Sequence, residues 1–131
     1  MATVPLKTDE TASREARAVF DDIRATRQTE YINNFWRAMA NDPATMAATW
    51  ARLKQVMGPG ALDPLVKEML YIAVSVANGC EYCVHSHTAS AKAKGMSQEM
   101  YGELFAVIGM AAQTNTLATA MQVPVDDRFR A

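Results

Sequence analysis

Two Asp-Pro pairs, Asp42-Pro43 and Asp63-Pro64, restrict the fold of this chain more than any other feature. Aspartate is a preferred helix N-cap and proline is favoured at the first helical position, so each pair marks a helix start. Apolar residues at helical spacing follow both pairs: Met46, Trp50, Leu53 and Met57 after the first, and Leu65, Met69, Ile72 and Val76 after the second. The sequence therefore predicts two consecutive helices in the middle of the chain.

Similar periodicity predicts helices on either side of this pair. They cover residues 11–26, 33–40 and 79–94, and a last helix runs from Ser97 to Val123-Pro124. Asn78 and Glu81 resemble a capping box, which places the start of the 79–94 helix at Gly79. We expect an all-α fold of about six helices in a single domain over residues 1–131.

One segment of the second Asp-Pro helix is ambiguous. Ile72, Val74 and Val76 alternate as in a β-strand, and their β-branched side chains favour extended structure. The helix start signal nevertheless runs into this segment without a break, and no second strand is available for pairing. We therefore predict a helix.

Charge and hydropathy exclude several classes of function. The chain has 131 residues, with 13 Lys and Arg against 14 Asp and Glu, so it offers no basic field for nucleic acid. Its longest apolar stretch, residues 69–77, is about half of what a bilayer span requires, so we expect no membrane insertion. The first residues do not resemble a secretory signal, and we expect a cytoplasmic protein.

Both cysteines lie in one short motif, Cys80-Glu81-Tyr82-Cys83, with His87 four residues further on. At about 100° per residue, Cys83 lies about 300° and His87 about 340° around a helix from Cys80, so the three share one stripe. In a reducing compartment, such cysteines are more typical of redox or metal chemistry than of a structural disulfide. The motif is therefore the candidate site, whereas His85 faces elsewhere and is expected to have a packing or hydrogen-bonding role.

The same spacing allows thiol chemistry. Residues three apart in a helix have Cα atoms about 5 Å apart, within the range of a disulfide. An ordinary thiol is only a few per cent ionised at neutral pH, but a helix N-terminus and an imidazole both favour the thiolate. We therefore assign Cys83, beside His87, as the thiol that attacks a peroxide, and Cys80 as the thiol that resolves the sulfenic acid. Attack by the first cysteine, as in many thioredoxin-like sites, is the alternative order.

Glu68 lies in the preceding predicted helix. If that helix folds back over the motif, the carboxylate can orient His87 and complete a carboxylate, imidazole and thiol relay. A glutamate in an arbitrary helix more often faces solvent, so this contact is a hypothesis.

Glu68, Cys80-x-x-Cys83 and His87, with these spacings, resemble the signature of the AhpD-like alkylhydroperoxidases, within the carboxymuconolactone decarboxylase superfamily. The resemblance covers residues 63–126 and implies an all-α homo-oligomer, commonly a trimer or hexamer, that acts as a thiol-dependent peroxidase. It implies a hydroperoxide substrate and a dithiol reductant of the lipoamide type, with no other cofactor. Tyr82 departs from the pattern, since well-known members have histidine before the second cysteine. A phenol can pass a proton less readily than an imidazole, so Tyr82 is a candidate member of a weaker relay.

Three alternatives remain. Cys80, Cys83 and His87 have the ligand types of a three-residue zinc site. Lactone decarboxylation gives the superfamily its name, although those enzymes as a group lack the paired thiols. In the third, the cysteines are inert and the chain is a non-catalytic helical oligomer. The aromatic residues are expected in the core or in a wall between subunits: Phe35, Trp36 and Trp50.

Overall fold

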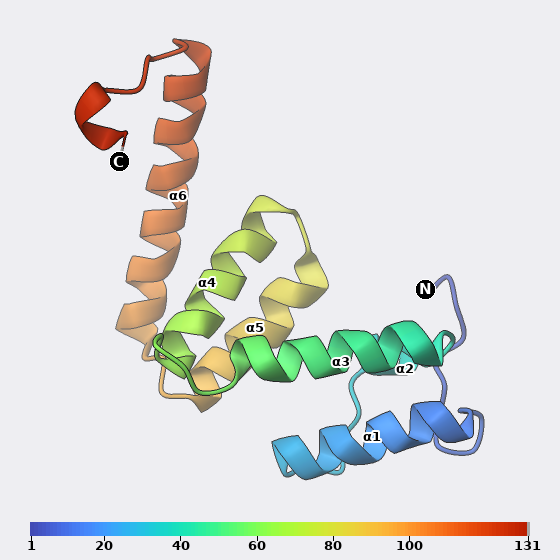
Figure 1. The fold of residues 1–131 in the computed structure, drawn as a ribbon. Helices are drawn as coiled ribbons and strands as arrows, with labels where there is room; N and C mark the ends of the chain where they lie inside the picture. The colour runs from blue at the N-terminus through green and yellow to red at the C-terminus, as the bar shows by residue number, and fades with distance from the viewer. Residues whose placement is uncertain (131) are drawn as a thin grey trace. The chain divides into compact units, whose positions relative to one another are not determined.

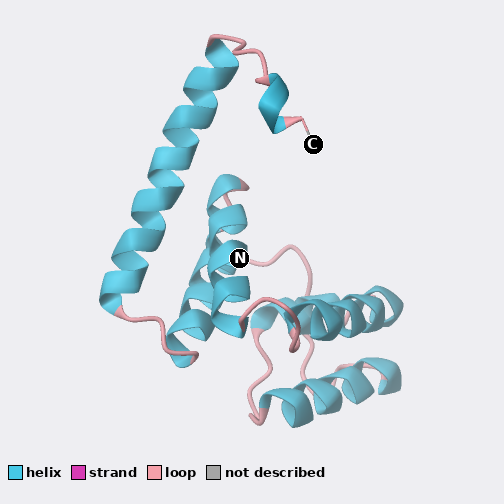
Figure 2. Cartoon of the chain, turned by 60° about the vertical axis from the view of Figure 1, so that its left-hand side comes forward, coloured by secondary structure: helices cyan, strands magenta, loops and turns pink. Residues whose placement is uncertain are grey.

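The computed structural model describes residues 1–130, which form helices joined by loops (Figure 1 and Figure 2). The helices are α1 (Arg14–Arg27), α2 (Asn34–Met39), α3 (Pro43–Met57), α4 (Pro64–Ala77), α5 (Glu81–Ala93) and α6 (Gln98–Ala120), followed by a 3-10 turn at Asp127–Phe129. No strand occurs within residues 1–130, so the predicted all-α class of about six helices is confirmed. None of the helices in this part of the chain has the length and apolar character needed to cross a bilayer.

The chain divides into two compact units, Met1–Gly58 and Pro59–Ala131. The first unit contains α1, α2 and α3, and the second contains α4, α5 and α6. That both units form one domain, as the sequence suggested, stays a prediction.

The first unit begins each of its helices with a side-chain cap. Ser13, Asn33 and Asp42 each accept a hydrogen bond from the backbone amide three residues further on, which satisfies a donor that the helix itself cannot. The largest buried side chains of this unit form its core: Phe20, Ile23, Ile32, Trp36, Met46 and Trp50. Trp36 and Trp50 therefore lie in the core, which is one of the two places expected for the aromatic residues. Phe35 is partly exposed.

The second unit is built on α4 and α5, which lie side by side and are joined by a tight loop (Figure 1). Asp63 caps α4 with Pro64 at its first position, and the helix continues through Ile72, Val74 and Val76. The helix predicted for this segment is thus confirmed. Ile72 is buried together with Ala91 of α5 and Met96 beyond it, and partly buried residues of α4 and α6 pack against them.

The start of α5 differs from the prediction. Asn78 ends α4 as its C-cap, Gly79 has a positive φ of 66°, and Cys80 is the N-cap of α5. The predicted capping box between Asn78 and Glu81, with a helix start at Gly79, was therefore wrong. Glycine adopts this left-handed conformation without steric cost, and it reverses the chain between the two helices.

The C-terminal half of α6 extends beyond α4 and α5 (Figure 2). Its residues 109–120 are all exposed, and so is the chain from there to residue 130. The large apolar residues exposed along this helix and just after it are Phe105, Val107, Met110, Leu117 and Met121. The described unit therefore leaves an apolar surface on α6 without cover.

Candidate active site

Cys80 and Cys83 form a disulfide at the N-terminus of α5, with Cα atoms 5.3 Å apart. The backbone amide of Cys83 donates to Cys80 Sγ over 3.3 Å, so the sulfur acts as the helix cap. The backbone amide of Cys80 donates to the carbonyl oxygen of Ser75 over 2.9 Å, which fixes the loop. The structure thus holds the two sulfurs in bridged form where the helix presents partial positive charge.

Packing of α5 on α4 brings Glu68 and His87 together. His87 Nδ1 lies 2.7 Å from Glu68 Oε2, and both side chains are largely buried, with 19% and 5% of their surfaces exposed. An ionised carboxylate only accepts hydrogen bonds, so His87 Nδ1 carries the proton and donates it. In the neutral ring, Nε2 is then the nitrogen that can accept a proton.

Two residues that the sequence analysis did not identify complete the surroundings of Glu68. Ser90 Oγ donates to Glu68 Oε1 over 2.8 Å, and Lys94 Nζ donates to the same oxygen over 2.9 Å. Ser90 lies on the face of α5 that carries His87, three residues further on, and Lys94, seven residues further on, is the C-cap of that helix. That helical spacing was visible in the sequence, but a serine and a lysine near the end of a helix are common on solvated faces.

These contacts determine the protonation state of Glu68. Burial by itself raises the pKa of a carboxyl group. Hydrogen bonds from His87, Lys94 and Ser90, with the charge of Lys94, outweigh burial and lower the pKa of Glu68 to about 2. Glu68 is therefore a buried anion at neutral pH.

Tyr71, one turn after Glu68 on α4, forms a further wall of the site. Its ring stacks on the His87 imidazole with centroids 3.6 Å apart and planes 19° from parallel. The sequence analysis did not identify Tyr71, because its helical spacing from Glu68 indicates a shared face but no partner on the next helix.

The sequence of this chain matches a known protein family. The family model described as the carboxymuconolactone decarboxylase family matches residues 43–126, which is more than half of the chain. The chain belongs to this family. The matched residues include the Cys80–Cys83 disulfide and the Glu68–His87 pair.

Within this family, the chain is AhpD-like. It superposes on a crystal structure of the alkylhydroperoxidase AhpD core from Rhodospirillum rubrum with a TM-score of 0.96 and 57% identity, covering 100% of this chain and 98% of that chain. Alkyl hydroperoxide reductase AhpD from Solibacter usitatus is 38% identical over 77 residues, 58% of this chain and 42% of that protein. The AhpD of Anaeromyxobacter dehalogenans is 32% identical over 114 residues, 82% of this chain and 61% of that protein. The matched part is less than two thirds of the length of each of these two reductases. The predicted AhpD-like membership is confirmed by the family match and by the AhpD core structure.

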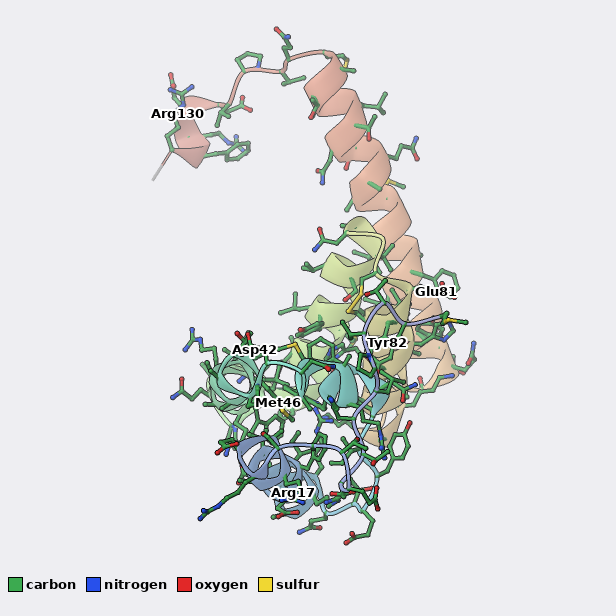
Figure 3. All side chains as sticks on the ribbon, turned by 90° about the vertical axis from the view of Figure 1, so that its right-hand side faces the viewer. Arg17, Asp42, Met46, Glu81, Tyr82 and Arg130 are labelled. Carbon is green, nitrogen blue, oxygen red and sulfur yellow. A yellow bond between two sulfur atoms is a disulfide. The ribbon has the colours of Figure 1, made fainter. Side chains whose placement is uncertain are left out.

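Three residues between Cys80 and His87 lie at the surface of this AhpD-like chain: Glu81, Tyr82 and His85. Tyr82 and its neighbour Glu81 form the first turn of α5 (Figure 3), and the Tyr82 side chain is 42% exposed. His85 is also exposed, and the packing or hydrogen-bonding role expected for it stays a prediction. Glu68 and His87 are buried together, whereas Tyr82 lies at the surface of the same helix.

The zinc alternative requires at least three ligands around one point. Within residues 1–130, no group of three or more His, Cys, Asp and Glu side chains has a suitable arrangement for a metal ion. Cys80 and Cys83 bond to each other, and His87 uses Nδ1 to contact Glu68. The arrangement in residues 1–130 therefore does not fit the three-ligand zinc site of the alternative interpretation.

Proposed function

We propose that this AhpD-like chain is a thiol-dependent peroxidase that reduces hydroperoxides through a cycle of the Cys80 and Cys83 thiols. The observation that carries this proposal is the disulfide at the start of α5, on the same helix as the His87 that Glu68 holds. The AhpD core structure and the two AhpD-named relatives also support it.

The first step is the attack of the Cys83 thiolate on the peroxide. His87 Nε2 accepts the proton of the Cys83 thiol, while the Nδ1 proton stays on the hydrogen bond to Glu68. The thiolate attacks one peroxide oxygen, the O–O bond breaks, and the proton on His87 passes to the departing alkoxide. The products are an alcohol and a sulfenic acid on Cys83. Tyr82, the exposed residue immediately before Cys83, is a candidate proton donor at the edge of this site.

The second step closes the disulfide. The thiol of Cys80 attacks the Cys83 sulfenic sulfur, the S–O bond breaks, and one water molecule leaves. The result is the bridged form that the structure contains.

A dithiol of the lipoamide type then restores both thiols. Its first thiolate attacks Cys83 and releases Cys80 as a thiolate, and its second thiol displaces Cys83 and becomes a cyclic disulfide. The amide that donates to Cys80 Sγ stabilises the leaving thiolate of this step. Because the cycle needs a supply of reduced dithiol, we assign the protein to the cytoplasm.

A second copy of the chain is the partner that best explains the apolar surface of α6. Phe105, Val107 and Met110 are each more than half exposed. Burying such side chains between subunits removes apolar area from water at roughly 25 cal/mol per Å². We propose a homo-oligomer, a trimer or a hexamer, in which α6 contributes to the interface.

Peroxide consumption with dihydrolipoamide as reductant tests the proposal. We expect near-complete loss of turnover in Cys80→Ser and Cys83→Ser, and a large loss in His87→Ala. Lys7→Ala, in the first unit and distant in sequence from the motif, is the control and should retain activity. Turnover that survives Cys83→Ser would refute the assigned nucleophile.

Decarboxylation of a carboxymuconolactone, the reaction in the family's name, is measured on the same samples. The paired cysteines favour redox chemistry, so we expect no carbon dioxide release. Release that persists in Cys83→Ser would instead favour the decarboxylase and leave the thiols without a role in it.

A further inference from the structure

Lys94 joins the buried pair of Glu68 and His87 without touching the sulfurs. Its Nζ lies 2.9 Å from Glu68 Oε1 and 2.9 Å from Ser90 Oγ, and Ser90 donates to the same carboxylate oxygen. The other oxygen, Oε2, receives His87 Nδ1. The two oxygens of the buried Glu68 carboxylate therefore contact two different groups: the Lys94 ammonium and the His87 imidazole, which becomes a cation when it takes up a second proton.

The charge of Glu68 needs compensation, because only 5% of its side chain is exposed. Two groups can supply it: the Lys94 ammonium, or His87 after it takes up a second proton. A lysine ammonium ordinarily stays charged across the neutral range. Lys94 therefore neutralises Glu68 without any proton on His87 Nε2.

We propose that Lys94 is a positioning residue that keeps His87 neutral, with its proton on Nδ1, so that Nε2 stays free to take the proton of the attacking thiol. This inference rests on the proposed peroxidase function. It adds that Lys94 sets the pH range in which His87 can accept the thiol proton. Without Lys94, the Glu68 carboxylate would be balanced best by an imidazolium, which has no lone pair for a thiol proton.

The groups around His87 support this assignment. From α4, the ring meets the Glu68 carboxylate and the Tyr71 phenol. On α5, its neighbours are Lys94, through Glu68, and the exposed His85. The acidic residues of α6, which packs on α4, are exposed: Glu99 and Glu103. Lys94 is thus the basic side chain that bonds to the carboxylate holding His87.

The test compares the pH dependence of kcat/KM for peroxide in the full-length wild type, Lys94→Met and Lys94→Arg. In Lys94→Met, the acidic limb of the kcat/KM profile should move to higher pH by about one unit. On that limb kcat/KM should be roughly tenfold lower than in the wild type, whereas at high pH it should change little. Lys94→Arg keeps the charge and should restore the wild-type limb. Lys92→Met removes an exposed lysine of the same helix that contacts the Tyr101 ring, and should leave the profile unchanged.

A second measurement does not depend on turnover. In the disulfide form, ¹⁵N NMR of the His87 ring reports whether Nε2 carries a proton. We expect the ring of Lys94→Met to stay protonated to higher pH than that of the wild type. In a Glu68→Gln background the buried charge is gone, so Lys94→Met should no longer change the protonation of the ring.

The outcomes separate the two proposals. A wild type that reduces no peroxide would refute the peroxidase function, while the NMR comparison would still decide the role of Lys94. An unchanged His87 titration in Lys94→Met, or an equal loss of kcat/KM at every pH, would overturn the positioning role and leave Lys94 as a structural ion-pair partner.

Discussion

The imidazole of His87 lies flat against the phenol ring of Tyr71, with centroids 3.6 Å apart and planes 19° from parallel. Glu68, on the same helix as Tyr71, holds Nδ1 of this ring at 2.7 Å. Two residues of α4 therefore hold the imidazole: Tyr71 contacts one face of the ring, and Glu68 binds Nδ1 at its edge. A proton acceptor that is fixed in this way keeps Nε2 in one direction, and loss of such orientation is costly for catalysis.

Substitution of Tyr71 tests this restraint. Tyr71→Phe keeps the stacked ring, so activity should stay within about twofold of the wild type. Tyr71→Leu removes the aromatic contact, worth roughly 1 kcal/mol, and we expect about tenfold lower kcat. Steady-state peroxide reduction measures both. Equal activity in the Leu and Phe variants would show that stacking does not orient His87.

Because the pKa of Glu68 is low in the folded protein, the free energy of unfolding should decrease at acidic pH. Its pKa of about 2 in the folded protein lies below the ordinary value of 4.5, so the stabilisation is fully present above pH of about 4.5 and is lost as pH falls toward 2. The shift corresponds to on the order of 3 kcal/mol at most. Urea unfolding of Glu68→Gln at several pH values should lose this dependence, whereas Glu103→Gln on the exposed face of α6 should keep it.

Cys80 is the N-cap of α5, in addition to the resolving role that we propose for it. Under reducing conditions, Cys80→Ser keeps a side-chain acceptor for the Cys83 amide, whereas Cys80→Ala removes it. We expect the alanine variant to be less stable by about 1 kcal/mol. Both variants lose dithiol turnover, so denaturant unfolding distinguishes capping from catalysis. Identical free energies of unfolding would show that the cap contributes nothing.

The uncovered surface of α6 predicts self-association. Met110 is 59% exposed, and an added charge there would be buried in an oligomer. Met110→Glu should therefore shift the sedimentation coefficient toward that of a monomer. Gln55→Glu, which adds the same charge at an exposed polar position of α3, should not. A wild type that sediments as a monomer would contradict the proposed assembly.

Most of the fold followed from local signals in the sequence. Asp42-Pro43 and Asp63-Pro64 start helices because cap chemistry is local, and the structure shows both caps. The start of α5 was predicted wrongly because Asn78 and Cys80 compete for the cap. A sulfur that accepts the helix amide, with Gly79 turning the chain, is weaker as a sequence signal than Asn followed by Glu.

The site was predictable along one helix and less so between helices. The spacing of Cys80 and Cys83 allowed the disulfide that the structure contains, and Glu68 was a candidate partner of His87 from α4. The shared face of both cysteines with His87 stays a prediction. The contacts of Tyr71 and Lys94 depend on how α4 and α5 pack, so no local pattern in the sequence specified them.

A single-turnover reaction tests the central claim most directly. Fully reduced protein is mixed with one equivalent of an alkyl hydroperoxide, and the disulfide and the alcohol are measured together by mass spectrometry. We predict one Cys80–Cys83 disulfide and one alcohol per chain in the wild type, and a sulfenic acid on Cys83, trapped by dimedone, in Cys80→Ser. Peroxide that remains unconsumed while both thiols stay reduced would contradict the account.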